Sequence, residues 1–103
     1  MKKSERYLSI LHQVADETEI NAEQIVSACK REDVADARAL LINLLYEEGF
    51  YPIQISGLSG ICPRCVNTYI SQFKDRVDSK RMLGIYYDNV KRKLRESKED
   101  TPS

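Results

Sequence analysis

Apolar residues return every three or four positions along most of this chain, and this spacing limits the folds open to it. Residues 34–48 show the pattern best, because their apolar members would share one face of a helix that ends at Gly49. These members are Val34, Ala37, Leu41, Leu44 and Leu45. Alternation typical of a strand occurs only within residues 51–55, and no second segment offers it a partner. The chain is therefore expected to be all-α.

Helical spacing and capping residues divide the chain into six expected helices. They cover about residues 4–16, 22–30, 34–48, 52–58, 63–77 and 80–96. Asn21, Asp33 and Ser79 would cap the second, third and last helices, since short polar side chains accept hydrogen bonds from free N–H groups there. Pro52 suits the first turn of the fourth helix. A chain of 103 residues supports one core, so the prediction is a single domain over residues 1–96 with a flexible tail at 97–103.

The sequence predicts a cytoplasmic protein that is not an enzyme. Its longest apolar run, residues 40–46, is too short to span a bilayer, and the first residues turn polar where a signal peptide would turn apolar. Three cysteines are an odd count that does not suit a disulfide framework. The chain has a single histidine, no candidate Ser-His-Asp set is visible around it, and no pair of carboxylates suggests a catalytic pocket. No cofactor is expected.

The net charge is zero, but the charges are divided unevenly along the chain. Residues 1–61 hold six Lys/Arg and ten Asp/Glu, a net charge of −4. Residues 62–95 hold nine Lys/Arg and three Asp/Glu, a net charge of +6. Because phosphates respond to the field within about 10 Å, a basic segment can bind nucleic acid even in a neutral protein. The alternative is that these charges only cover solvated helix faces.

Residues 52–73 fit a helix-turn-helix, in which two helices are joined by a tight turn that favours glycine, here Gly60. On a helical wheel the second helix has one apolar face, formed by Val66, Tyr69, Ile70, Phe73 and Val77. The opposite side carries polar residues of the kinds that read bases in the major groove, although any amphipathic helix has a polar outer face. The residues expected to contact bases of double-stranded DNA are Arg64, Asn67, Thr68 and Ser71. Those expected to contact phosphates are Lys74, Arg38, Lys91 and Arg92.

The run from Arg31 to Leu41, in which a valine and an Ala-Arg pair open an aliphatic helix, resembles the second long helix of the C-terminal DNA-binding domain of the bacterial replication initiator DnaA. A short gap, an Ile-Gly/Ser helix, a glycine turn and a helix opening that ends in Val follow in the same order. The similarity extends over about residues 7–95. It implies a Trp-repressor-like fold and general DNA binding by a bacterial replication or transcription factor.

On that resemblance, Arg38 matches an arginine of the family's long helix, and Arg64, Asn67 and Thr68 fall at the start of its recognition helix. The family signature, Gly-Gly-basic-Asp-His-Thr/Ser-Thr-Val, is not present. A nucleotide-binding run of the type G-x-x-x-x-G-K-[ST] is also missing from the sequence, so this chain alone is not expected to use a nucleotide.

Cys62 and Cys65 form a C-x-x-C pair that allows two further interpretations. With Cys29 and His12 they would make a Cys₃His zinc set, although those two residues lie on separate expected helices. As a thiol–disulfide pair, they would sit at a helix start, where the helix dipole lowers a thiol pKa. That chemistry is usual at a strand–helix junction, and no strand is expected here.

A third class is an interaction module that keeps the fold without binding DNA. Its surface would include Tyr86, Tyr87 and the basic cluster of the last helix, and it would bind a protein partner or a second copy of the chain. The basic cluster comprises Lys91, Arg92, Lys93 and Arg95. Salt dependence separates the classes, because a DNA binder loses affinity steeply as salt rises.

Overall fold

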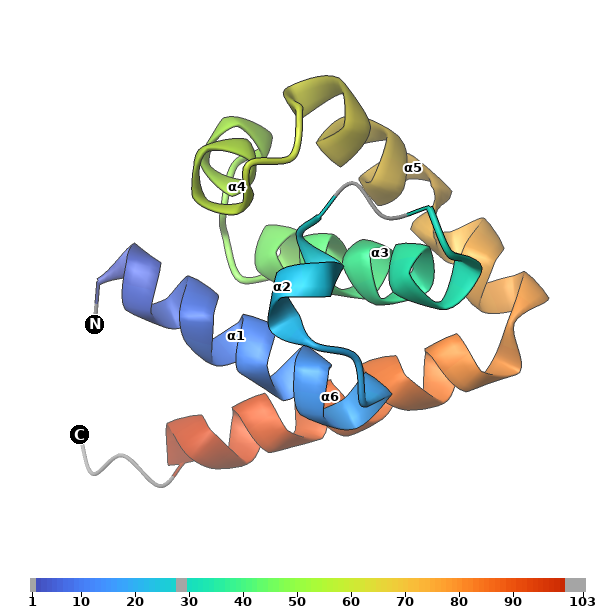
Figure 1. The fold of residues 1–103 in the computed structure, drawn as a ribbon. Coiled ribbons are helices and arrows are strands. Elements are labelled where there is room, and N and C mark those ends of the chain that lie inside the picture. The colour runs from blue at the N-terminus through green and yellow to red at the C-terminus, as the bar shows by residue number, and fades with distance from the viewer. Residues whose placement is uncertain (1, 28–29, 100–103) are drawn as a thin grey trace.

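The computed structural model describes residues 2–27 and 30–99, and this part of the chain contains helices and no strand (Figure 1). The helices of the described residues are α1 (Lys3–Thr18), α2 (Ala22–Ile25), α3 (Glu32–Glu47), α4 (Pro52–Ser59), α5 (Pro63–Ser79) and α6 (Arg81–Glu99). The predicted all-α class and the predicted order of six helices are confirmed.

Local sequence explains where several helices begin and end. The Asn21 side chain caps α2 as predicted, accepting a hydrogen bond of 2.8 Å from the backbone N–H of Glu23. Gly49 and Gly60 follow α3 and α4 with φ of 101° and 80°, a left-handed conformation that other residues adopt only at a cost. The two glycines therefore end their helices.

Two helix starts differ from the prediction. The N-cap of α3 is Arg31, so Asp33 lies inside the first turn, where its carboxylate accepts a hydrogen bond of 2.9 Å from the N–H of Val34. Ser79 does not cap the last helix, because α5 continues through it and only Lys80 separates α5 from α6. Lys80 forms ion pairs with carboxylates of α3, which hold the bend one residue later than the capping rule suggests.

Two helix ends also differ. Helix α2 ends at Ile25, well before the predicted residue 30; of that predicted stretch, residues 28–29 lie outside the described part. Helix α6 continues to Glu99, three residues into the predicted tail. The remaining predicted tail residues, 100–103, lie outside the described residues.

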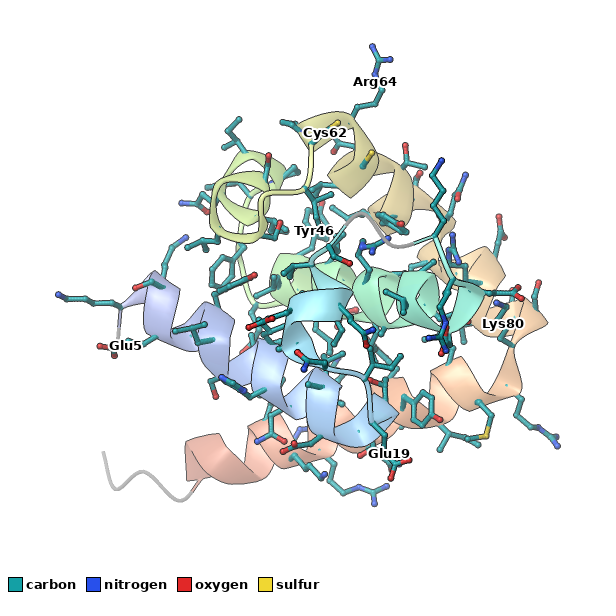
Figure 2. All side chains as sticks on the ribbon, in the orientation of Figure 1. Glu5, Glu19, Tyr46, Cys62, Arg64 and Lys80 are labelled. Atoms are coloured by element: carbon teal, nitrogen blue, oxygen red, sulfur yellow. The ribbon has the colours of Figure 1, made fainter. Side chains whose placement is uncertain are left out.

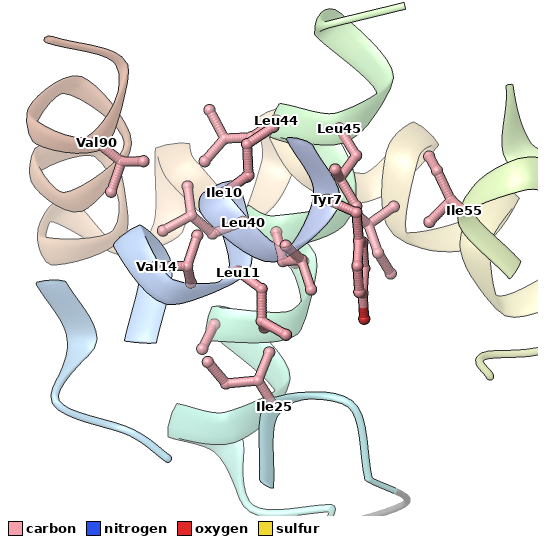
Figure 3. Close-up of a cluster of buried hydrophobic side chains, with 14 of the residues drawn as sticks. Tyr7, Ile10, Leu11, Val14, Ile25, Leu40, Leu44, Leu45, Ile55 and Val90 are labelled. Atoms are coloured by element: carbon pink, nitrogen blue, oxygen red, sulfur yellow. The ribbon is translucent and has the colours of Figure 1, made fainter. Parts of the chain in front are cut away.

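Helix α3 runs through the centre of the fold and packs against α1, α2, α4, α5 and α6. Residues 37–45 of α3 are all buried, so the helix is enclosed on every side and not along one stripe only. This agrees with its nearly continuous aliphatic sequence, since a helix that is apolar all round has to be buried. Figure 3 shows Leu40 and Leu44 of α3 packed with Ile10 of α1 and Val90 of α6.

Candidate nucleic-acid interface

Helices α4 and α5 form a compact pair joined by a closed turn. Figure 1 shows α4 nearly end-on while α5 crosses the view, so the two helices cross steeply. Between them, the buried Ser59 hydroxyl donates a hydrogen bond to the carbonyl of Ile55 (2.7 Å) and accepts one from the N–H of Ile61 (3.2 Å). The left-handed Gly60 then redirects the chain toward α5. Ser59 thus fixes the turn together with Gly60.

The inner face of α5 anchors the helix to the rest of the protein. Val66 is fully buried and Phe73 nearly so, at 0% and 7% exposure, as the helical wheel predicts. Tyr69, Ile70 and Val77 are partly buried and pack against the same core. Because this side of α5 is fixed, the opposite side has a defined orientation.

The outer face of α5 is open to solvent over its first turns. Arg64, Asn67, Thr68 and Ser71 are all exposed, so the structure brings the four predicted base-contacting residues together on one surface. Figure 2 shows Arg64 projecting away from the body of the protein beside Cys62. Among the described residues, neither Arg64 nor Asn67 has a side-chain hydrogen-bond partner.

The two hydroxyl groups on this face are turned toward the helix backbone. Thr68 donates a hydrogen bond of 2.9 Å to the carbonyl of Arg64, and Ser71 donates one of 3.1 Å to the carbonyl of Thr68. Their protons are thus engaged, while their oxygen atoms keep lone pairs that face solvent. In this conformation both hydroxyls can accept hydrogen bonds from a ligand but not donate them.

Arg38 is a correction to the predicted site. Its side chain is only 6% exposed, and its guanidinium donates hydrogen bonds to the carbonyl of Ile25 (2.9 Å), the carbonyl of Ser27 and the hydroxyl of Tyr69 (3.1 Å). A buried guanidinium that ties α2 and its following segment to α3 and α5 is not placed to reach a phosphate. The burial of Arg38 could not be predicted from the sequence, because an arginine in an aliphatic helix usually packs its apolar stem on the helix and extends its charged end into solvent.

Much of the basic charge of residues 62–95 is paired with carboxylates of the first half of the chain. Asp36 binds Arg76 at 3.0 Å and Lys80 at 2.8 Å, and Glu32 also binds Lys80, at 2.6 Å. The hydrogen bonds from Lys80 raise its pKa, with Asp36 as the larger cause, and in turn lower the pKa of Glu32. The net charge of +6 that the sequence suggests is therefore not a free surface charge.

The predicted phosphate ligands of α6 are placed differently from one another. Lys91 pairs with Glu47 at 3.1 Å and donates a hydrogen bond of 3.2 Å to the Tyr87 hydroxyl, and these two contacts raise its pKa. Arg92 is exposed on α6, which lies across α3 from the first turns of α5 (Figure 1). Lys74 is exposed on α5 itself and has no ion-pair partner among the described residues.

The sequence did not indicate an exposed apolar surface beside α4. Tyr51 and Ile53 are 67% and 69% exposed, and Tyr46 at the end of α3 is 47% exposed. A shallow hollow next to them is lined by Tyr46, Tyr51 and Asn67 among other residues. The only sequence signal was the alternation within residues 51–55, which in a helix places Ile55 in the core and Ile53 outside.

In the described part of the chain, the structure does not bring Cys62, Cys65 and His12 of the alternative zinc set together. Cys62 and Cys65 are free, exposed thiols at the start of α5, and His12 is exposed on α1. Cys29 lies outside the described residues. Within residues 2–27 and 30–99, no cluster of three or more histidine, cysteine or acidic side chains could hold a metal ion.

Fold and site together define a class: an all-α protein in which a glycine turn joins two helices and the second presents an exposed polar face. Comparison of the chain with protein-family models, with curated proteins and with solved structures finds no match. The likeness to the DnaA C-terminal domain, and with it the Trp-repressor-like arrangement, stays a prediction from the sequence. In the part of the chain that is described, none of the helices combines the length and apolar character needed to cross a membrane.

Proposed function

We propose that α4 and α5 form a helix-turn-helix that binds double-stranded DNA, with the first turns of α5 in the major groove. The observation that carries this proposal is the pairing of a rigidly anchored inner face of α5 with an open outer face that holds Arg64, Asn67, Thr68 and Ser71. An α-helix about 10–12 Å wide fits the major groove, which is about 12 Å wide. On this proposal the protein serves replication or transcription in the cytoplasm.

Each residue of the outer face would have a distinct role. Arg64 can donate two hydrogen bonds to guanine O6 and N7, and Asn67 can pair with adenine N6 and N7. Thr68 and Ser71, whose protons are engaged by backbone carbonyls, would accept from an amino group of cytosine or adenine. Specificity would therefore come mainly from Arg64 and Asn67.

Phosphate binding would rely on few cations. With Arg38 buried and Lys91 paired, Arg64 and Lys74 are the unpaired cations that the described part of α5 exposes near its outer face. With Arg64 assigned to guanine, Lys74 is left for phosphate, and one phosphate contact corresponds to a slope of about −1 for the logarithm of the binding constant against the logarithm of the salt concentration. The free N–H groups at the start of α5 would add a contact to phosphate.

The test is selection of random duplexes at low salt, followed by affinity measurements with single variants. Arg64→Ala should weaken binding about 10- to 150-fold, equal to about 1–3 kcal/mol, and relax the preference at one base position. Arg81→Ala is the matched control, because Arg81 is exposed but begins α6, beyond the far end of α5, a helix about 25 Å long with Arg64 near its start. Unchanged affinity and preference in both Arg64→Ala and Asn67→Ala would contradict the proposal.

A second candidate function is a protein-interaction module. The observation that favours it is the exposed apolar surface of Tyr46, Tyr51 and Ile53, together with the pairing of so many cations inside the protein. The predicted partner surface on α6 is less available, because Tyr87 donates a hydrogen bond to Glu47 and packs on Phe73. Selection that recovers no duplex at low salt would favour this candidate over DNA binding.

A further inference from the structure

Cys62 and Cys65 occupy defined positions in the first turn of α5. Cys62 is the N-cap, and its carbonyl already accepts the helical hydrogen bond from the N–H of Val66, at 3.0 Å. Pro63 fills the first helical position, where its missing N–H costs nothing. Cys65 follows one turn after Cys62, and both thiols are free and exposed. Figure 2 shows Cys62 at the outer edge of the protein. The backbone of this dithiol is therefore ordered, and its sulfur atoms are open to reagents.

The spacing suits an intramolecular disulfide. Residues three apart in a helix have Cα atoms separated by about 5 Å, from a rise of about 1.5 Å and a turn of about 100° per residue. Disulfides join Cα atoms that are about 4.4–6.8 Å apart. Cys62 and Cys65 can thus be bridged without unwinding α5.

The two thiols also differ in acidity in a way that suits sequential reaction. The pKa of Cys62 is lowered, because its thiolate would accept hydrogen bonds from the backbone N–H and then the thiol of Cys65, with a smaller effect of Arg64. The pKa of Cys65 is raised, chiefly by its role as donor to Cys62. Cys62 is therefore the attacking group and Cys65 the resolving group, since the thiolate is the nucleophile.

We propose that Cys62 and Cys65 are a reversible modification site, which forms an intramolecular disulfide by exchange with low-molecular-weight disulfides such as oxidised glutathione. The Cys62 thiolate attacks one sulfur of the disulfide, forming a mixed disulfide and releasing one thiolate, which takes a proton from water. Deprotonated Cys65 then attacks the Cys62 sulfur and releases the second thiolate. Overall, two protein thiols are oxidised to one disulfide, and the reagent is reduced to two thiols. The inference is independent of DNA binding.

The test uses the full chain carrying Cys29→Ser, which removes the third thiol. After incubation with oxidised glutathione, intact mass should show a species lighter by two hydrogens, which reduced glutathione converts back. With Cys65→Ser added, the reaction should stop at one glutathione adduct on Cys62. With Cys62→Ser instead, adduct formation should be slower at neutral pH, because the backbone N–H of Cys65 stabilises a thiolate at position 62 and no backbone N–H does so for Cys65.

A second measurement separates the folded site from the bare C-x-x-C sequence. The pH midpoint of the first exchange step, measured in Cys29→Ser/Cys65→Ser, should be lower in the folded chain than in the same chain unfolded in urea. Equal midpoints would overturn the assignment of Cys62 as an activated thiol. Accumulation of a chain with two glutathione adducts, in place of the internal disulfide, would overturn the site itself.

Discussion

Replacing Arg38 with methionine tests whether this arginine holds the fold together or binds a phosphate. Methionine keeps much of the length and apolar volume of the stem but removes every hydrogen bond that the guanidinium donates. The bonds to the carbonyls of Ile25 and Ser27 and to the Tyr69 hydroxyl are lost together. Since these partners lie in α2, the residues after it and α5, the change also removes a link between three parts of the chain.

The magnitude follows from what each partner does once Arg38 is gone. Ile25 is fully buried, so its carbonyl is left without that donor, at a cost of about 1–3 kcal/mol. Ser27 is exposed, and water can replace the arginine at its carbonyl. A lost hydrogen bond to a charged group adds about 1.5–3 kcal/mol, while relief of the buried charge offsets part of the sum. We expect Arg38→Met to lower the free energy of unfolding by about 2–4 kcal/mol.

Urea unfolding followed by circular dichroism measures this loss. The free energy of unfolding of Arg38→Lys should lie between those of Arg38→Met and the parent protein, since lysine can keep one of the hydrogen bonds. Hydrogen exchange should report the largest loss of protection in α2. Duplex binding, measured where both variants are folded, should keep its salt slope. The structural role is refuted if Arg38→Met changes the free energy of unfolding by less than about 0.5 kcal/mol while the salt slope falls by about one unit.

Three other changes test the turn, the core and an ion pair. Gly60→Ala should lower the free energy of unfolding in urea by about 1–2 kcal/mol and Gly60→Asn by less, because Gly60 has a left-handed φ of 80° and no atom within 4 Å would clash with a Cβ. Equal losses for the two variants would show that the left-handed backbone is not the cause. Ile55→Ala should cost about 2–5 kcal/mol by opening a cavity between α4 and the core, with exposed Ile53→Ala as the control; similar losses for the two would contradict the packing. The hydrogen bond from Lys80 lowers the pKa of Glu32 below its ordinary value of 4.5. The stabilisation of the folded protein by the Lys80–Glu32 pair is therefore present above pH 4.5 and is lost as the pH falls through the lowered pKa. Glu32→Gln should therefore flatten the fall in the urea midpoint between about pH 5 and 3, and an unaltered profile would mean that the pair does not form in solution.

Features set by neighbours along the chain could be predicted from the sequence. The cap at Asn21 and the stops at Gly49 and Gly60 depend on the conformation of a single residue, and the structure shows all three. The division of α5 into faces depends only on helical periodicity, so the exposure of Arg64 and the burial of Val66 followed from the spacing. These local rules were enough for the fold class and for the composition of the outer face.

Features set by residues distant in sequence could not be predicted. Arg38 is buried because two carbonyls and a tyrosine from other segments meet it, and no local pattern carries that information. Ser79 is a good capping residue by local rules, but the bend between α5 and α6 is held at Lys80 by Glu32 and Asp36, which lie 48 and 44 residues away. Tertiary contacts override local preference in both cases.

The ion pairs explain why the basic second part of the chain does not present a large basic surface. Folding brings Asp36 next to Arg76 and Lys80, and Glu47 next to Lys91, so cations of the second half meet carboxylates of the first. Such partly exposed pairs each add only about 0–1 kcal/mol to stability. Their larger effect is on recognition, because every paired cation is one fewer available to a phosphate. If the protein binds DNA as proposed, the complex would therefore depend on base contacts from the start of α5 more than on the overall field of the protein, and Arg64 and Asn67 would be the decisive residues.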